Sequence, residues 1–572
     1  FWLKSREVVS TRGGCRDCAR ARVQGAGPVA EPVMGSQKLP RSCLGRAADR
    51  LRWSCRGSSG SAEATDGPPS GGAGGGQQWR VALIALFSAL GSMLFGLDIG
   101  YIGPIIESES FRVDVAHIAA DEKISSAVEG LIVSLFSLGA ICTSFPVVSS
   151  FFLDAWGRKA SIGLGSGVFI VANCIQGTAC SIPRLLVGRF VAGMSVGLLS
   201  SVIVLYQSEV APASMRGALS TLYQLGITFG ILIAAYIDQL LVDRPDGWRH
   251  VMGIICIPAA LLIVGMPFMP QSPRWLVQVG RDQEALEVLR TIRSEEEATQ
   301  EFADIQLEHK LTVVAGVPRW SELFQGRVAQ LIVLGIALQL LQQLVGMNAF
   351  MYFGPKIFES IGFSKNVFTT INNFINFIST FPAIILADRV GRRSLMLWSA
   401  IGMTASCAVM GVMGLLFVQE VVNAQGETAL QVTSPTGGWV IAVSIFFFVF
   451  NFAYGFGPIV WVYCAEIFPF RYSARAVGIC TMANWVGNFM IAQFTPMLLE
   501  GIQFNTFFVF GFFALLGVFL SAWLPETKEV PLENVQKLFD GRAWFCRTAK
   551  SAEAYAAEAS LGPMRRPIVG GH

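Results

Sequence analysis

Long apolar segments alternate with short polar ones along most of this chain, and the pattern predicts membrane-spanning helices. An α-helix rises 1.5 Å per residue, so an apolar run of about 20 residues can cross about 30 Å of hydrocarbon. Such runs lie near 81–106, 127–150, 160–179, 185–206, 218–238 and 250–269, and again near 328–352, 367–387, 394–418, 438–463, 474–497 and 503–524. The sequence therefore predicts an all-α membrane protein whose twelve spans form two six-helix bundles.

The polar segment between the two sets of spans predicts short helices at the membrane surface. Within 271–327, apolar residues such as Ala285, Val288, Leu289 and Ile292 recur at helical spacing. The first residues of the chain are rich in Arg, Ser and Gly and have no such periodicity, which is typical of a disordered or targeting segment. The predicted organisation is a leader at 1–79, a bundle at 80–270, a linker at 271–327, a second bundle at 328–525 and a tail at 526–572.

Composition supports a membrane environment and argues against several other functions. Hydrophobic residues make up 52% of the chain and charged residues 15%, against about 25% charged in soluble proteins. The net charge of +3 is too small to indicate nucleic-acid binding. Most cysteines stand alone in apolar runs, and Cys15-x-x-Cys18 has no second pair at zinc spacing, so no metal or cofactor is expected. No motif of a hydrolase or a phosphate-binding enzyme occurs, so an enzyme is not expected.

The two halves carry matching charged motifs in loops that the basic residues assign to the cytoplasm. Positively charged loops stay inside, which places both termini in the cytoplasm. The motif Asp154-Ala-Trp-Gly-Arg158-Lys159 recurs as Asp388-Arg-Val-Gly-Arg392-Arg393. The other pairs are Ser208-Glu209-Val-Ala-Pro212 with Arg216 and Ala465-Glu466-Ile-Phe-Pro469 with Arg471, then Pro270-Gln-Ser-Pro-Arg274 and Pro525-Glu526-Thr-Lys528. Homologous halves around a central site are typical of alternating-access carriers.

With these loops, Gln342-Gln343-Leu-Val-Gly346-Met-Asn348 and Gly457-Pro458-Ile-Val-Trp461 complete a set of motifs over residues 80–535. In this set the chain closely resembles the sugar porters of the major facilitator superfamily. The resemblance implies the major facilitator fold, a functional monomer in a lipid bilayer, and transport of a monosaccharide such as glucose. It leaves open a polyol or inositol carrier, because amide side chains hydrogen-bond in the same way to the hydroxyls of either kind of ring. A non-transporting sugar sensor is a further alternative.

Amide side chains inside the predicted spans are the candidate sugar ligands. Unpaired amides are costly in a bilayer, and amides offer the donors and acceptors that hydroxyls need. The predicted substrate-binding residues, which the resemblance also assigns, are Gln224, Gln342, Gln343, Asn348, Asn376, Trp461, Asn484 and Asn488. The predicted cavity-lining residues are Phe95, Ile231, Phe452 and Trp485. The alternative is that the amides only join helices to one another.

The repeated loop charges suggest a cytoplasmic gate. Acids and arginines at the helix ends can form ion pairs that join the two halves and open for inward access. The predicted gate residues are Asp154, Arg158, Glu209, Arg216, Arg274, Asp388, Arg392, Glu466 and Arg471. Anchoring of positive loops together with helix capping is the alternative. Gln271 and Ser473 depart from the family pattern, which usually has Glu and Arg there.

Two charged residues interrupt apolar spans and raise the question of proton coupling. Asp98 lies in the first span and Arg189 in the fourth. Burial favours the protonated form of a carboxylate and a nearby cation favours the ionised form, so an Asp that alternates between the two can couple to protons. The resemblance implies that proton-coupled members use this pair, whereas mammalian facilitators have Asn in place of Asp98 and Glu in place of Ala453. A passive carrier with a structural ion pair stays open, as does the choice between the plasma membrane and an organelle envelope.

Overall fold

The structure is a computed structural model that describes residues 75–119, 122, 124–211, 216–242, 244–315, 319–422, 428–468, 470–528 and 536–539. The chain divides into two units, Phe1–Ser70 and Gly71–His572, and every described residue belongs to the second. Nearly all of the predicted leader and most of the predicted tail therefore lie outside the described residues. The predicted domain boundaries themselves stay predictions.

Helices of the first half follow the predicted spans closely. They are α2 (Gly75–Ser88), α3 (Leu90–Ile106), α5 (Ser126–Ser144), α6 (Pro146–Gly177), α7 (Ile182–Val210), α8 (Arg216–Leu241), α9 (Gly247–Ile254) and α10 (Cys256–Gly265). The short α4 (Glu109–Phe111) and the π-helix η2 (Arg112–Ala116) lie between α3 and α5. The linker forms α11 (Pro273–Gln278), α12 (Asp282–Ile292), α13 (Glu295–Ala315) and α14 (Trp320–Leu323), as its helical periodicity predicted.

The second half repeats this layout and adds one hairpin. Its helices are α15 (Gly326–Leu344), α16 (Met347–Tyr352), α17 (Gly354–Ser360), α18 (Lys365–Val390), α19 (Arg392–Phe417), α20 (Pro435–Asn451), η4 (Phe452–Phe456), α21 (Gly457–Glu466), α22 (Phe470–Gly501) and α23 (Thr506–Trp523). Strands β1 (Val418–Val422) and β2 (Thr428–Val432) pair antiparallel, with Val418 opposite Val432. Apart from this hairpin, the described residues fit the predicted all-α class.

Eleven of the described helical segments are long and apolar enough to cross a membrane. The remaining predicted span is α22, which has sufficient length but carries Asn484, Asn488 and Gln493. These amides lower its apolar character, so its assignment as a span depends on the repeat rather than on its hydropathy. Eleven of the twelve predicted spans are thereby confirmed by length and composition, and the twelfth carries two of the candidate ligands, Asn484 and Asn488.

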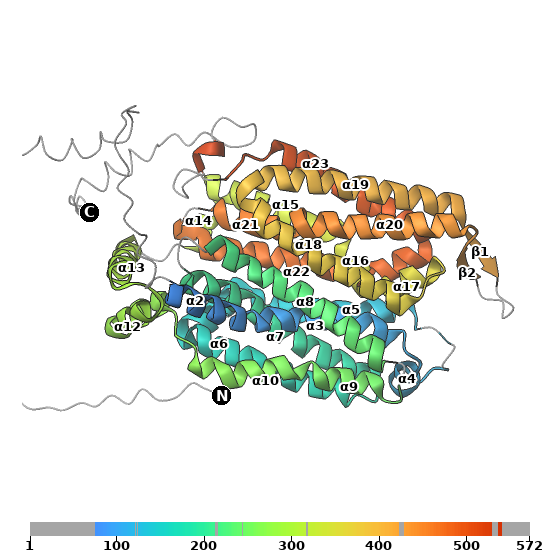
Figure 1. The fold of residues 1–572 in the computed structure, drawn as a ribbon, viewed down its shortest axis with the longest axis horizontal. Helices are drawn as coiled ribbons and strands as arrows, with labels where there is room; N and C mark the ends of the chain where they lie inside the picture. Colours follow the sequence, from blue (N-terminus) through green and yellow to red (C-terminus); the bar gives the residue numbers. More distant parts are fainter. Residues whose placement is uncertain are drawn as a thin grey trace, which may run out of the picture. The chain divides into compact units, whose positions relative to one another are not determined.

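The two halves meet chiefly along two helix pairs, α5 with α22 and α8 with α18, and α16 also packs against α3. Figure 1 shows the first half in blue to green and the second in yellow to red, with α12 and α13 at one end of the helices and β1–β2 at the other. We call the end near α12 and α13 the linker end, and we call the opposite end the hairpin end. Short helices α4 and α17 lie toward the hairpin end (Figure 1).

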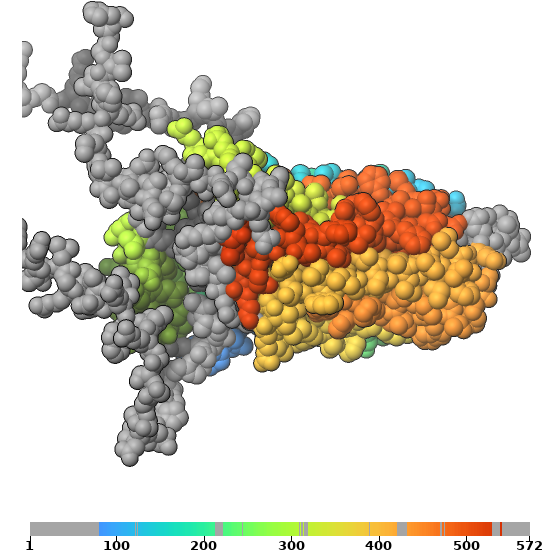
Figure 2. Space-filling model, turned by 90° about the horizontal axis from the view of Figure 1, so that it is seen from above, coloured from blue at the N-terminus to red at the C-terminus, as the bar shows by residue number. Residues whose placement is uncertain are grey.

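Large apolar side chains cover the outer surface of the second half. Trp398 and Leu415 on α19 and Phe519 on α23 are each more than half exposed. The face in Figure 2 consists mainly of such second-half helices, in yellow to red. Exposed aromatic and aliphatic surface of this extent is costly in water and suits a hydrocarbon solvent.

Small residues let α5 and α7 pack closely, and this contact generates a test of the fold. A Cβ added to Gly193 would overlap the carbonyl oxygen of Phe136, which is backbone and cannot rotate away. We expect Gly193→Ala to reduce the free energy of unfolding by about 1–3 kcal/mol. The matched control is Gly163→Ala on α6, where nothing lies within 4 Å and Ala favours the helix by up to about 1 kcal/mol. Thermal unfolding in detergent measures both, and equal midpoints for the two variants would contradict this packing.

Candidate functional site

A cluster of amide side chains joins α15 to α22 in the interior of the second half. Asn484 lies at its centre: its Nδ2 donates to Gln339 Oε1 at 2.7 Å and to Gln342 Oε1 at 2.6 Å. Its Oδ1 accepts from Gln343 Nε2 at 2.9 Å. Gln342 Nε2 also donates to the carbonyl of Gly457 at 2.7 Å, where η4 passes into α21. Each amide is oriented by at least one neighbour.

A break between α15 and α16 brings the next part of the cluster into place. Gly346 has a φ of +90°, which L side chains rarely adopt, and α16 begins directly after it. Asn348 in α16 then donates through Nδ2 to Gln343 Oε1 at 2.7 Å and to Asn488 Oδ1 at 3.2 Å. The hydroxyl of Tyr352 lies 3.3 Å from Asn488 Oδ1. The broken helix therefore turns two polar side chains toward α22.

The structure brings five of the predicted amides into this cluster, which we call the amide cluster: Gln342, Gln343, Asn348, Asn484 and Asn488. It also contains Gln339 and Tyr352, which the sequence analysis missed. Gln339 precedes Gln343 by four residues and Tyr352 follows Asn348 by four, so helical periodicity could have found both. The role of these residues in sugar binding stays a prediction.

Three other predicted ligands lie at the margin of the cluster or apart from it. Asn376 on α18 is buried and its Nδ2 lies 3.7 Å from Met351 Sδ in α16. Gln224 on α8 is half-buried, and its side chain forms no hydrogen bond with the part of the chain that the structure describes. Trp461 on α21 is also half-buried. Each of these three side chains therefore retains a polar or aromatic group that can contact a ligand.

Aromatic rings join the amide cluster to the first half. Trp485 follows Asn484 on α22, and its ring centroid lies 4.9 Å from that of Phe95 and 6.0 Å from that of Phe136. The indole Nε1 of Trp485 is buried and has no acceptor among the described residues. The other two predicted cavity residues, Ile231 and Phe452, are buried on α8 and η4. The unused indole N–H is a donor available to a polar ligand.

Asp98 and Arg189 form an ion pair that is completely shielded from solvent. Arg189 Nη1 lies 2.8 Å from Asp98 Oδ2, and both side chains have zero exposed area. Arg189 Nε also donates to the Ile132 carbonyl at 3.0 Å. The Tyr101 hydroxyl lies 3.0 Å from both Asp98 Oδ1 and Gln176 Oε1. The sequence singled out the two charged residues, and the structure adds the three neutral groups that position them.

Phe136 on α5 connects this ion pair to the amide cluster. The guanidinium of Arg189 lies 4.9 Å from the centroid of the Phe136 ring. The same ring is the one that packs edge-on against Trp485. A cation over an aromatic face is attracted to it by about 0.5–2 kcal/mol, so a shift of Arg189 also affects the ring that touches α22.

At the linker end, the repeated motifs build the same local structure twice. Arg158 forms two hydrogen bonds with Glu209, at 2.7 and 2.8 Å, and Arg392 pairs with Glu466 at 3.1 Å. Each arginine follows a glycine with positive φ, Gly157 at +78° or Gly391 at +97°. Glycine tolerates this conformation because it has no Cβ. Both of these pairs lie within one half.

The residue that departs from the family pattern, Gln271, has a counterpart in the second half. Glu526 accepts from the backbone N–H groups of Arg392 and Arg393 at 2.7 and 3.0 Å, at the start of α19. In the first half, Gln271 Oε1 accepts from the Lys159 N–H at 3.4 Å. Capping such N–H groups requires only an acceptor oxygen, so an amide can replace a carboxylate at this position.

The predicted network between the halves is therefore not visible in the described ion pairs. Asp154 accepts through Oδ1 from Gln278 Nε2 at 3.5 Å, which is a contact between the first half and the linker, and Arg274 lies in α11. The side chains of Arg216, Asp388 and Arg471 lie outside the described residues. A cytoplasmic gate that joins the halves stays a prediction. The alternative, helix capping, is supported by the hydrogen bonds that Gln271 and Glu526 accept from backbone N–H groups.

At the hairpin end, by contrast, a charged contact crosses between the halves. Lys356 Nζ on α17 lies 2.9 Å from Glu129 Oε2 on α5. Beside it, a Cβ added to Gly103 on α3 would overlap the carbonyl oxygen of Tyr352 on α16. Backbone approach of this kind leaves no room for a solute between α3 and α16. The hairpin end is closed at this point.

Comparison with known proteins identifies the family. The model of the family described as "Sugar (and other) transporter" matches residues 84–539. This chain belongs to the sugar porter family of the major facilitator superfamily. It is 32% identical to the arabinose-proton symporter of Bacillus subtilis, over 80% of this chain and 95% of that protein. It is 33% identical to the galactose-proton symporter of Escherichia coli, over 80% and 94%.

A solved structure extends the likeness to three dimensions. The proton:xylose symporter XylE, bound to 6-bromo-6-deoxy-D-glucose, superimposes with a TM-score of 0.67 at 26% identity. The match covers 81% of this chain and all of XylE. The fold of this sugar porter is therefore that of the major facilitator superfamily, as its repeated motifs predicted.

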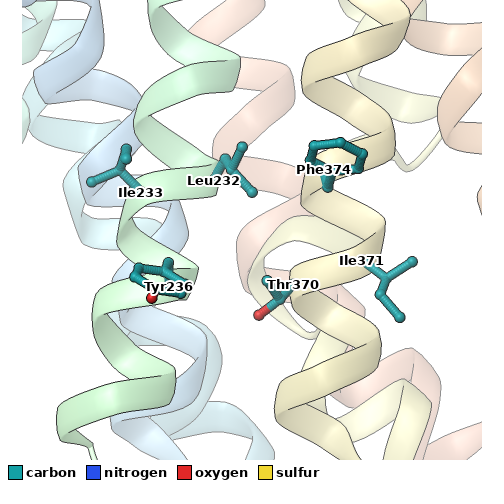
Figure 3. A pocket seen from close by; sticks show the side chains of 6 residues that line it. All are labelled: Leu232, Ile233, Tyr236, Thr370, Ile371 and Phe374. Atoms are coloured by element: carbon teal, nitrogen blue, oxygen red, sulfur yellow. The ribbon is translucent and has the colours of Figure 1, made fainter.

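The sugar porter also has an apolar groove of about 410 Å³ between the halves, away from the amide cluster. Figure 3 shows its six lining side chains on two helices, α8 and α18. They are Leu232, Ile233, Tyr236, Thr370, Ile371 and Phe374. Such a lining lacks the converging polar groups that a sugar needs and suits lipid chains. The amide cluster is the better candidate for a binding site.

The buried ion pair gives a prediction about stability. Asp98→Leu leaves the charge of Arg189 unpaired in a dry interior, so we expect unfolding to become easier by about 3–5 kcal/mol. Replacing both residues, as Asp98→Leu with Arg189→Met, removes the uncompensated charge and should restore much of the loss. Thermal unfolding of the wild type, both single variants and the double variant measures this coupling. A double variant that shows the sum of the two single losses would contradict a direct interaction.

Proposed function

We propose that this sugar porter carries a monosaccharide, a hexose such as glucose, across its membrane by alternating access in symport with protons. The observation that carries the proposal is the amide cluster of α15, α16 and α22. Its side chains are uncharged and offer both donors and acceptors, as a ring of hydroxyls requires. Trp485 adds an aromatic surface and an unused N–H at its edge.

Charge around the cluster argues for a neutral substrate. A carboxylate or phosphate would need a cation to compensate its charge within the bilayer. Arg189 is the buried cation that approaches the cluster through Phe136, and its charge is matched by Asp98. A polyol or inositol carrier would use the same amides, and competition with glucose separates these substrates.

Proton coupling is supported by the Asp98–Arg189 pair and by the relatives. Relatives named as proton symporters match 80% of this chain. Protonation of Asp98 would cancel its attraction for Arg189 and free the arginine to move against Phe136. A passive carrier would keep the pair intact through the whole cycle.

A path between sugar and proton sites runs through Tyr352. Its hydroxyl lies 3.3 Å from Asn488 in the amide cluster, and its carbonyl oxygen packs against Gly103 of α3. Asp98 lies on the same helix, five residues before Gly103. A sugar that draws in Asn488 and Tyr352 thereby favours packing of α16 onto α3, which closes the hairpin end.

The membrane orientation follows from the same proposal. Basic residues gather in the linker and the repeated motifs, so the linker end faces the cytoplasm and the hairpin end faces the opposite side. Both termini are then cytoplasmic and the transporter acts as a monomer, with the plasma membrane as the default location and an organelle envelope as the alternative.

Removal of one amide should weaken sugar binding. Asn488→Ala deletes a side chain that contacts both Asn348 and Tyr352. The loss of one neutral hydrogen bond, about 0.5–1.5 kcal/mol, should raise the dissociation constant for glucose by roughly 2–10-fold. Binding of radiolabelled glucose to purified protein measures it, with Gln300→Ala on the exposed surface of α13 as the control. Equal affinity in the two variants would place the sugar elsewhere.

Removal of the Asp98 carboxylate should uncouple transport from protons. In liposomes with an inward proton gradient, the wild type should accumulate glucose above equilibrium. Asp98→Asn cannot take up a proton there, so it should only equilibrate glucose and should lose its response to the gradient. Collapsing the gradient in the wild type is the control. Gradient-driven accumulation that persists in Asp98→Asn would show that coupling does not depend on this residue.

A further inference from the structure

Four acidic side chains are buried among the described residues, and one of them stands apart. They are Asp98, Glu129, Glu209 and Asp238. Three of these have a cation within 3 Å: Asp98 has Arg189, Glu129 has Lys356 and Glu209 has Arg158. For Asp238, which is 1% exposed, the described residues provide neither an ion pair nor a hydrogen bond to either carboxyl oxygen.

Asp238 lies on α8, toward the hairpin end from the coupling pair. Gly100 of α3 packs against Ile231 and Ala234 of α8, which fixes the register between these helices. Asp98 comes two residues before Gly100, and Asp238 four residues after Ala234. At 1.5 Å per residue, Asp238 is therefore about 10 Å nearer the hairpin end than Asp98.

Charged groups on the helices packed against α8 are engaged elsewhere. Two of these charged groups lie at about the same height along the helices as Asp238. Glu107, at the end of α3, pairs with Arg112. Arg249 on α9 pairs with Asp114 and Asp246. His250 on α9 contacts the Asp246 carbonyl, and Tyr101 on α3 contacts Asp98.

The remaining charges lie at other levels. Lys365 begins α18, five residues before Thr370, which is hydrogen-bonded to Gln239. On α7, Arg184 donates to the Thr178 hydroxyl, and Arg189 and Glu209 are paired with Asp98 and Arg158. No described group thus compensates a negative charge on Asp238.

An ionised carboxylate without a partner costs several kcal/mol in such an interior. With the hairpin end closed, Asp238 is therefore carried as the neutral acid. When α16 moves away from α3 and water enters, hydration of the carboxylate removes that cost and Asp238 ionises. Closing the hairpin end again then requires that Asp238 first take a proton from the solution on that side.

We propose that Asp238 is a second proton-binding site of this transporter, loaded from the hairpin-end solution before that end closes. This inference rests on the proposed transport cycle. The proton binds a carboxylate oxygen as the end closes and returns to the same solution as it reopens. Asp238 thus adds no proton to the transport stoichiometry. It makes closure depend on the pH of the solution at the hairpin end, separately from coupling at Asp98.

Infrared spectroscopy of the full chain in lipid tests the protonation directly and does not depend on sugar transport. Asp98 takes up a proton in the proposed cycle, so the spectra are recorded in an Asp98→Asn background, where Asp238 should contribute the C=O stretch of a buried protonated carboxyl. We expect Asp238→Asn to remove this band and Asp246→Asn, an exposed acid beyond the same helix, to leave it unchanged. A band that is absent in the Asp98→Asn background, or that persists in full in a folded Asp98→Asn with Asp238→Asn, overturns the proposal. If Asp238→Asn does not fold, Asp238→Glu must shift the band, and an unshifted band has the same consequence.

Transport provides the second readout, in a background where Asp98 cannot titrate. In Asp98→Asn, glucose exchange should still fall as the pH at the hairpin end rises, because an ionised Asp238 opposes closure. Asp98→Asn with Asp238→Asn should lose this fall. An identical pH profile in the two variants overturns the role in closure. A chain that moves no sugar at all contradicts the proposed function instead, and leaves the infrared result to decide the protonation of Asp238.

Discussion

Hydrocarbon offers no hydrogen-bond partner, so each polar group within the spans must be satisfied by the protein itself. This constraint explains why the polar residues of this transporter occur in connected sets. Asn484 alone binds three other amides, and Arg189 is held by a carboxylate, a carbonyl and an aromatic face. The indole N–H of Trp485 and the carboxyl of Asp238 have no partner among the described residues, which leaves the first available to a substrate and the second to a proton.

The two halves of the internal repeat form the same local structure at the same place in the chain. Where the chain turns after the second span of each half, a glycine with positive φ directs an arginine back to a glutamate on another helix of that half. An acceptor oxygen from the last span of that half, Gln271 or Glu526, contacts the adjacent N–H groups. The motifs are conspicuous in the sequence because several residues must act together. Their ion pairs hold each half together, which suits halves that move as rigid bodies.

Features that depend on local pattern could be predicted from the sequence. Span lengths, the linker helices and the amides of α15 and α22 follow from periodicity and from the cost of polar residues in a membrane. The hydropathy of α22 is weak for the same reason, because its amides belong to the cluster. Contacts between distant segments could not be read in this way. The Lys356–Glu129 pair joins residues 227 positions apart, and the local sequence around either residue does not indicate the other. The unpaired state of Asp238 likewise becomes visible only when its neighbours are placed.

The account depends most on the claim that sugar and protons move together. The direct measurement is proton entry into liposomes loaded with a pH-sensitive dye, after glucose is added outside in the absence of any proton gradient. The account predicts that glucose acidifies the interior, with a rate that saturates as glucose binding does. Glucose entry without acidification would contradict it and would make this sugar porter a passive carrier, in which Asp98 and Arg189 only hold α3 and α7 together.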